Sequence, residues 1–281
     1  MTTSTSRSPV PPNGGTDTPN PTNEPLPIVE IFLKSITLSF EKIGQLLRLA
    51  WPYALYLLVD NTFLSIPPPE SIESLEPFEL LEFQQSMIFI LGFGLISLFL
   101  GPMAGVGCHR VFLLDKEEAL STKIFRWQAR ERDYFVCYFL IFILSSIPTI
   151  VISILLNVFY SPDVIDLEKI EVISFLEYLL TMLPSFYIFS RLSLLLPGSA
   201  LGRYPTLVSA WKASSGNAIS LFILIGVLPL ITGYLLDTFQ IISNGSLLFK
   251  FIGNIAMVVI ITIELCCLSL SYEWIKNRDS T

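Results

Sequence analysis

Long apolar windows constrain this chain more than any other feature, because a helix needs about 20 apolar residues to cross a hydrocarbon core. Six windows qualify, at approximately 47–66, 86–106, 135–159, 173–196, 217–239 and 249–272. In hydrocarbon every backbone polar group must be satisfied within the structure, which favours helices. We therefore predict an all-α integral membrane bundle of six transmembrane helices. Pro52 and Asp60 weaken the apolar character of the first window.

Composition supports a membrane protein and divides the chain. Of 281 residues, 52% are hydrophobic and 15% charged, whereas soluble domains carry roughly 25% charged residues. Residues 1–27 are rich in Ser, Thr, Pro, Asn and Gly, so we predict a disordered N-terminal tail. This tail lacks the features of a cleaved secretory signal. Residues 28–276 form the predicted membrane domain, which begins with an interfacial amphipathic helix, and 277–281 form a short cytoplasmic tail.

Positive charge predicts the orientation of the bundle. Of the 17 Lys and Arg residues, only Lys169 and Lys250 fall on the opposite side from the rest. Cytoplasmic segments carry the excess of Lys and Arg, so both termini are predicted to be cytoplasmic. The four tryptophans map to the same interface, where indole rings prefer to lie, and are the predicted anchors: Trp51, Trp127, Trp211 and Trp274.

A helix on the membrane surface is predicted before the first window. Its apolar residues recur at steps of three or four: Val29, Phe32, Ile36, Phe40, Ile43 and Leu47. This stripe is expected to face the headgroups or the bundle. Weaker versions precede the third and fifth windows. The chain is therefore consistent with three copies of a surface helix plus two spans, and sequence alone leaves this repeat open.

Ionisable residues within the windows are candidate functional groups, because they are costly in a membrane and usually face its protein interior. Asp60, Glu177 and Asp237 share the outer third and form a candidate outer vestibule. Arg191 and Glu264 both fall in the inner third and form a candidate intramembrane charge pair. For Arg191 two alternatives stay open, namely snorkelling to the headgroups or lipid phosphates, and contact with a substrate.

Catalytic motifs are missing. The sequence holds no GxSxG, Walker A or HExxH motif, and no nucleophile, base and orienting group occur together. The single histidine, His109, is predicted to contact headgroups, and the four cysteines are predicted to be small core residues. The stretch "GPMAG", Gly101 to Gly105, has a spacing that permits close helix contact. We expect no enzymatic activity, no cofactor and no bound metal.

One stretch carries a family resemblance: "RLSLLLPGSALGRYPTLVSAWKASSGN", Arg191 to Asn217. It combines an Arg at the end of a span, an apolar stretch closed by Pro197, and a polar step into the next span. This resembles the multi-pass membrane domain fused to some bacterial glycerophosphodiester phosphodiesterases, and the uncharacterised six-helix inner-membrane proteins related to it. The resemblance implies a bacterial cytoplasmic membrane. The phosphodiesterase domain has no counterpart here, so its activity is not implied.

The expected function is that of a non-enzymatic integral membrane protein involved in envelope or lipid-related organisation. The alternative is a permease-like transporter of a small molecule or lipid, with the outer vestibule at one end and Arg191 near the inner gate. The expected partners are the lipid bilayer, anionic lipid headgroups at the cytoplasmic face and unidentified proteins, with no nucleic acid.

Overall fold

The computed structural model describes residues 25–63, 77–121, 126–159, 170–242 and 246–279, and all regular structure within them is helical. The longer helices are α1 (Ile28–Glu41), α2 (Ile43–Phe63), α3 (Pro77–Leu113), α5 (Ala129–Phe159), α6 (Ile170–Leu192), α10 (Leu228–Ile242) and α11 (Leu247–Asp279). The short helices are α4 (Lys116–Leu120), α7 (Leu195–Ala200), α8 (Leu207–Ala213), η4 (Ser215–Asn217), α9 (Ala218–Leu221) and the π-helix η5 (Phe222–Val227).

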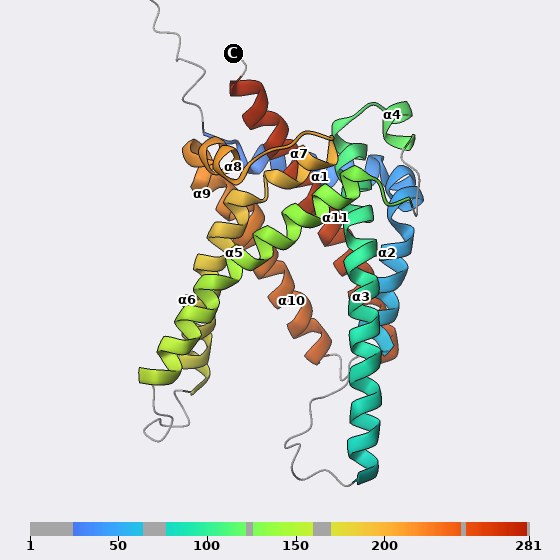
Figure 1. Cartoon of the computed structure of the whole chain (residues 1–281), viewed down its shortest axis with the longest axis vertical. Coiled ribbons are helices and arrows are strands. Elements are labelled where there is room, and N and C mark those ends of the chain that lie inside the picture. The colour runs from blue at the N-terminus through green and yellow to red at the C-terminus, as the bar shows by residue number, and fades with distance from the viewer. Residues whose placement is uncertain (1–24, 64–76, 122–125, 160–169, 243–245, 280–281) are drawn as a thin grey trace, which may run out of the picture.

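The long helices run back and forth between two ends of the molecule (Figure 1). Helices α1, α4, α7 and α8 gather at one end, which we call the α1 end, and the C-terminal part of α11 reaches the same end (Figure 1). The α5–α6 pair lies apart from the α2–α3 pair towards the other end, with α10 between them (Figure 1).

Among the described residues, five helical segments are long and apolar enough to cross a membrane: Leu91–Leu113, Ala129–Leu156, Leu176–Ala200, Ser215–Leu236 and Leu248–Arg278. They correspond to the last five predicted windows. The first window lies within α2, whose apolar part among the described residues is the shorter segment Ile43–Val59. The helical membrane class is therefore confirmed with five candidate spans, and a sixth stays a prediction.

The packed core lies at the α1 end. Its fully buried apolar residues include Val106 and Val111 of α3, Leu195 of α7 and Cys266 of α11. Further from this end, long helices expose large apolar side chains such as Leu95 of α3. Such side chains suit contact with lipid, so this surface is consistent with immersion in a bilayer.

The buried face of helix α1 coincides only partly with its apolar stripe, of which Phe32 packs against the core. Its buried residues are Ile31, Ser35 and Ser39, whereas Val29 and Phe40 of the predicted stripe are exposed. Small side chains allow close approach between helices where the surroundings are themselves apolar. Phe40 also lines a hollow along α1, α2 and α11, so the stripe is divided between the two predicted destinations.

The ends of the predicted membrane domain are more ordered than expected. Residues 1–24 of the predicted tail lie outside the described residues, but Leu26 is only 2% exposed and donates its N–H to Asn217 Oδ1 at 2.9 Å. At the other end α11 continues to Asp279 through most of the predicted C-terminal tail. Leu26 and the last turn of α11 thus belong to the described structure, and the predicted tails stay a prediction.

Prolines occur inside α2, α3, α5 and α6 without ending these helices. On α5 and α6 the neighbouring hydroxyls join the two helices. Thr149 Oγ1 lies 2.6 Å from Ser185 Oγ and donates to the Thr181 carbonyl at 3.1 Å. Side chains of this kind offset the hydrogen bond that proline lacks. The fifth span contains the π-helix η5, which ends two residues before Pro229.

Candidate functional site

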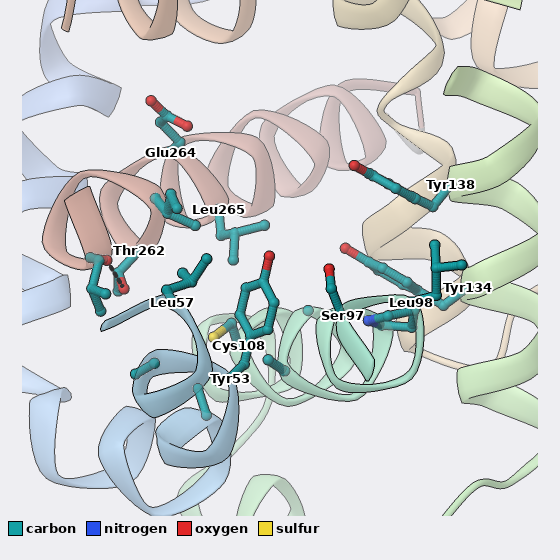
Figure 2. Close-up of a pocket in the computed structure, with 18 of the residues that line it drawn as sticks. Tyr53, Leu57, Ser97, Leu98, Cys108, Tyr134, Tyr138, Thr262, Glu264 and Leu265 are labelled. Carbon is teal, nitrogen blue, oxygen red and sulfur yellow. Dashed lines mark hydrogen bonds between the residues drawn. The ribbon is translucent and has the colours of Figure 1, made fainter. Parts of the chain in front are cut away.

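A cavity of about 390 Å³ lies among α2, α3, α5 and α11, and we call it the central cavity. Most of its wall is apolar. Its ionisable and hydroxyl-bearing side chains are Tyr53 of α2, Ser97 and Cys108 of α3, Tyr134 and Tyr138 of α5, and Thr262 and Glu264 of α11. Figure 2 shows the hydroxyls of Tyr53, Ser97, Tyr134 and Tyr138 directed towards one space, with Glu264 on the other side of the view.

The "GPMAG" motif makes room for two of these tyrosine rings. A Cβ placed on Gly101 would lie 3.7 Å from the Tyr53 ring, which is ordinary contact. A Cβ on Gly105 would lie 2.5 Å from Tyr134 Oη and 2.7 Å from its Cζ, which is too close to be tolerated. The motif was predicted to permit close contact between helices. In the structure its two glycines lie beside aromatic side chains of α2 and α5, the helices that pack on α3.

A hydrogen-bonded chain fixes the Tyr134 hydroxyl from behind. His109 Nδ1 lies 2.8 Å from Ser269 Oγ, and His109 Nε2 lies 3.3 Å from Tyr134 Oη. Ser269 donates its hydroxyl proton to the Leu265 carbonyl at 2.7 Å, so its oxygen accepts from His109. This assigns the proton of the imidazole to Nδ1 and makes Tyr134 the donor to Nε2.

The prediction that His109 contacts headgroups is wrong, because its side chain is fully buried between α3, α5 and α11. The exposed surface of α3 is apolar. The imidazole lies inside the bundle, where its polar partners are Ser269 and Tyr134. His109 is therefore a positioning residue for one wall of the cavity.

A second, apolar hollow adjoins the cavity. This hollow, of about 260 Å³, lies along α1, α2 and α11, and we call it the seam groove. Ala50 and Ala54 of α2 and Val258 and Thr262 of α11 line both spaces. Because the two alanines have small side chains, only a thin wall separates the central cavity from the seam groove at this place.

Arg191 lies at the end of α6 and holds α8 in place. Its side chain is only 6% exposed. Nε donates to Ser214 Oγ at 3.0 Å, and a terminal nitrogen donates to the Trp211 carbonyl. The guanidinium also lies 3.7 Å from the centre of the Trp211 ring, which is a close cation–π contact. Both partners belong to the C-terminal end of α8, where carbonyl oxygens attract cations.

The predicted charge pair between Arg191 and Glu264 is not formed in this structure. The three ion pairs among the described residues join Arg110 to Glu118, Arg130 to Glu131, and Arg132 to Asp133. The guanidinium of Arg191 is instead directed to α8, a helix that follows it closely in the sequence. Glu264 lines the central cavity. The prediction used only the depth of each residue in the membrane. It did not consider which side of its helix each residue occupies.

The outer vestibule is not tested. Glu177 is half-buried on α6, and its backbone carbonyl accepts from Thr181 Oγ1 at 2.9 Å. Asp60 and Asp237 fall on α2 and α10, but their side chains lie outside the described residues. The vestibule therefore stays a prediction.

The four predicted anchors all lie at the α1 end. Trp51, Trp127 and Trp211 are exposed there, and Trp274 is half-buried near the end of α11. Every described Lys or Arg other than Lys250 belongs to a segment at this end as well. This grouping agrees with the predicted asymmetry, while the identity of the two sides stays a prediction.

The cavity tyrosines were not recognised in the sequence. Tyr134 and Tyr138 are four residues apart at the start of α5, so they share one helix face, and this spacing was an available signal. Tyr53 gave no such signal, because its helix has little amphipathic character. Tyr residues near span ends ordinarily indicate only the membrane interface.

The described residues form an all-helical structure with five candidate membrane spans and a mostly apolar internal cavity that carries a few polar groups. Comparison with protein-family models, with curated proteins and with solved structures finds no match for this chain. The resemblance carried by Arg191 to Asn217 therefore stays a prediction.

Proposed function

We propose that this protein is a non-enzymatic, permease-like membrane protein that binds a small amphiphile and carries it within or across the bilayer. The observation that supports this most directly is the central cavity of about 390 Å³. Sites for small molecules commonly measure roughly 300–1,000 Å³ and combine apolar walls with a few convergent polar groups. The cavity has both properties.

An amphiphile fits the site better than a wholly polar solute. The polar head would lie among the hydroxyls of the central cavity, and its apolar tail would pass between α2 and α11 into the seam groove. Ala50 and Ala54 mark the place of passage, because they line both spaces. Prolines in α2 and α3, next to the cavity, would permit the bending that release requires.

The proposed location is a bacterial cytoplasmic membrane with both termini in the cytoplasm. The gathering of cations and tryptophans at the α1 end supports the orientation, and the resemblance of residues 191–217 supports the membrane. An organising role in the envelope, the other function expected from the sequence, needs no internal cavity, so the cavity favours the carrier.

Filling the cavity tests this proposal. Ser97→Phe places a ring in the cavity, and Leu95→Phe is the matched control because Leu95 lies on the same helix with its side chain exposed towards lipid. Native mass spectrometry of gently solubilised protein is expected to show a bound amphiphile in wild type and in Leu95→Phe, and its loss in Ser97→Phe. No bound molecule in wild type, or identical profiles in all three proteins, would favour the organising role.

A further inference from the structure

The central cavity carries a charge preference that its volume alone does not explain. Its titratable lining groups are Glu264, three tyrosine hydroxyls and the Cys108 thiol, and no Lys, Arg or His lines it among the described residues. The polar atoms around the space are therefore mainly oxygens, including one carboxylate. Oxygen lone pairs and a carboxylate attract a cation and repel an anion.

Three basic side chains of the bundle have polar partners of their own. Arg191 is bonded to the end of α8. Both ring nitrogens of His109 lie within hydrogen-bond reach of Ser269 and Tyr134. Arg110 approaches Glu118, and its guanidinium donates to the Glu118 carbonyl. By contrast, the Glu264 carboxylate forms no ion pair or hydrogen bond with a described residue.

The aromatic lining narrows the class of cation. Tyr53, Tyr134 and Tyr138 come from two helices and line one space, with their hydroxyls directed towards it (Figure 2). Aromatic rings bind organic ammonium groups through their faces, and a neighbouring carboxylate supplies the opposite charge. Among the described residues no group of three His, Cys, Asp or Glu side chains gathers to hold a metal ion. A single carboxylate instead matches a monovalent organic cation.

We infer that the central cavity selects an amphiphile with an organic ammonium head, with Glu264 as its counter-charge and the three tyrosines as its aromatic wall. This inference rests on the proposed function, because it specifies the ligand of the same cavity. Placing an ammonium group in a membrane is costly unless an opposite charge accompanies it. Glu264 meets that requirement at mid-length of α11.

The test compares two thiol reagents of similar size and opposite charge at one place in the cavity. A Ser97→Cys variant in a neutral maltoside detergent is treated with trimethylammonioethyl methanethiosulfonate or sulfonatoethyl methanethiosulfonate. Peptide mass spectrometry follows the introduced thiol apart from the native cysteines. Each rate is divided by the rate of the same reagent with 2-mercaptoethanol, which removes the intrinsic difference between the reagents.

The cationic reagent is expected to react about tenfold faster after this correction. Adding Glu264→Gln is expected to bring the ratio close to one. Glu273→Gln, an exposed acid further along the same helix, is the matched control and should leave the ratio unchanged. Hexyltrimethylammonium should protect the introduced thiol, while hexanoate should not.

The outcomes separate the two proposals. If neither reagent reaches the introduced thiol, the cavity is closed to solutes and the proposed function fails. If both react at equal corrected rates, or the anionic reagent is faster, the cavity binds solutes but the inference about the cation is overturned. A cationic preference that survives Glu264→Gln overturns the role given to that carboxylate.

Discussion

Replacing Arg191 tests the joint between α6 and α8. In Arg191→Ala the bonds to Ser214 and Trp211 and the contact with the Trp211 ring all disappear. Hydrogen bonds to a charged group contribute about 1.5–3 kcal/mol each, and a desolvated cation–π contact contributes about 2 kcal/mol. Because Ser214 also donates to the Trp211 carbonyl at 3.0 Å, that carbonyl keeps a partner.

Removing a buried cation also removes its desolvation cost, which offsets part of the loss. We therefore expect a net destabilisation of about 2–4 kcal/mol, below the sum of the individual contacts. A change of 1 kcal/mol shifts the melting temperature of a domain of this size by about 2–4 °C, so a fall of roughly 5–15 °C is expected. Arg191→Lys keeps the charge but loses the planar guanidinium, so its melting temperature should lie between those of wild type and Arg191→Ala.

Two measurements check this prediction. Thermal unfolding in detergent reports the stability, and amide hydrogen exchange reports whether residues 207–214 exchange faster in Arg191→Ala than in wild type. Amide exchange in α11 should stay unchanged, because Arg191 forms no ion pair or hydrogen bond with Glu264 on that helix. A melting temperature within 2 °C of wild type, together with unchanged exchange in α8, would refute the reasoning.

The same variant tests the charge pair that the sequence predicted. Since Arg191 and Glu264 share no contact, the effects of Arg191→Ala and Glu264→Gln should add within about 0.5 kcal/mol in the double variant. Recovery of stability in the double variant would show that the two residues interact after all.

Two further substitutions probe the neighbourhood of the cavity. Gly105→Ala should displace the Tyr134 ring, because the new methyl group would lie 2.5 Å from its hydroxyl oxygen. We expect the free energy of unfolding to fall by about 1–3 kcal/mol. In the Ser97→Cys background, protection of the introduced thiol by hexyltrimethylammonium should be lost. Unchanged values of both would contradict the predicted displacement. Lys42→Met removes the bond from Nζ to the Val111 carbonyl at 2.6 Å, at the end of α3. Its cost should be about 1–2 kcal/mol, while the exposed Lys34→Met should change stability by less than about 0.5 kcal/mol; equal effects would refute the role of the bond.

The helical membrane class followed from the sequence because it depends only on local composition. Five windows long enough to cross a hydrocarbon core became five long helices, without any knowledge of how they pack. The first window was harder to predict, because Pro52 and Asp60 interrupt it and its apolar part in α2 is short.

The side on which each helix packs could not be read in the same way. On α1 the apolar stripe predicts a buried face in a soluble protein, but in a membrane both environments accept apolar groups. The serines at 35 and 39 decide the packing instead, and hydropathy assigns them no such role. Likewise, Arg191 and Glu264 lie at a similar depth in the membrane, and the sequence predicts this depth. Whether they point towards each other depends on how α6 and α11 are rotated about their axes, and the sequence does not predict that rotation.

The separation of Arg191 from Glu264 bears directly on what the protein can bind. Had the two formed a pair, their charges would cancel, and the cavity would be neutral and suited to uncharged solutes. Because the end of α8 takes up the guanidinium, Glu264 is left in the lining of the central cavity without a basic partner among the described residues. The same contacts that make Arg191 a structural residue therefore leave Glu264 available as the charge that selects a ligand.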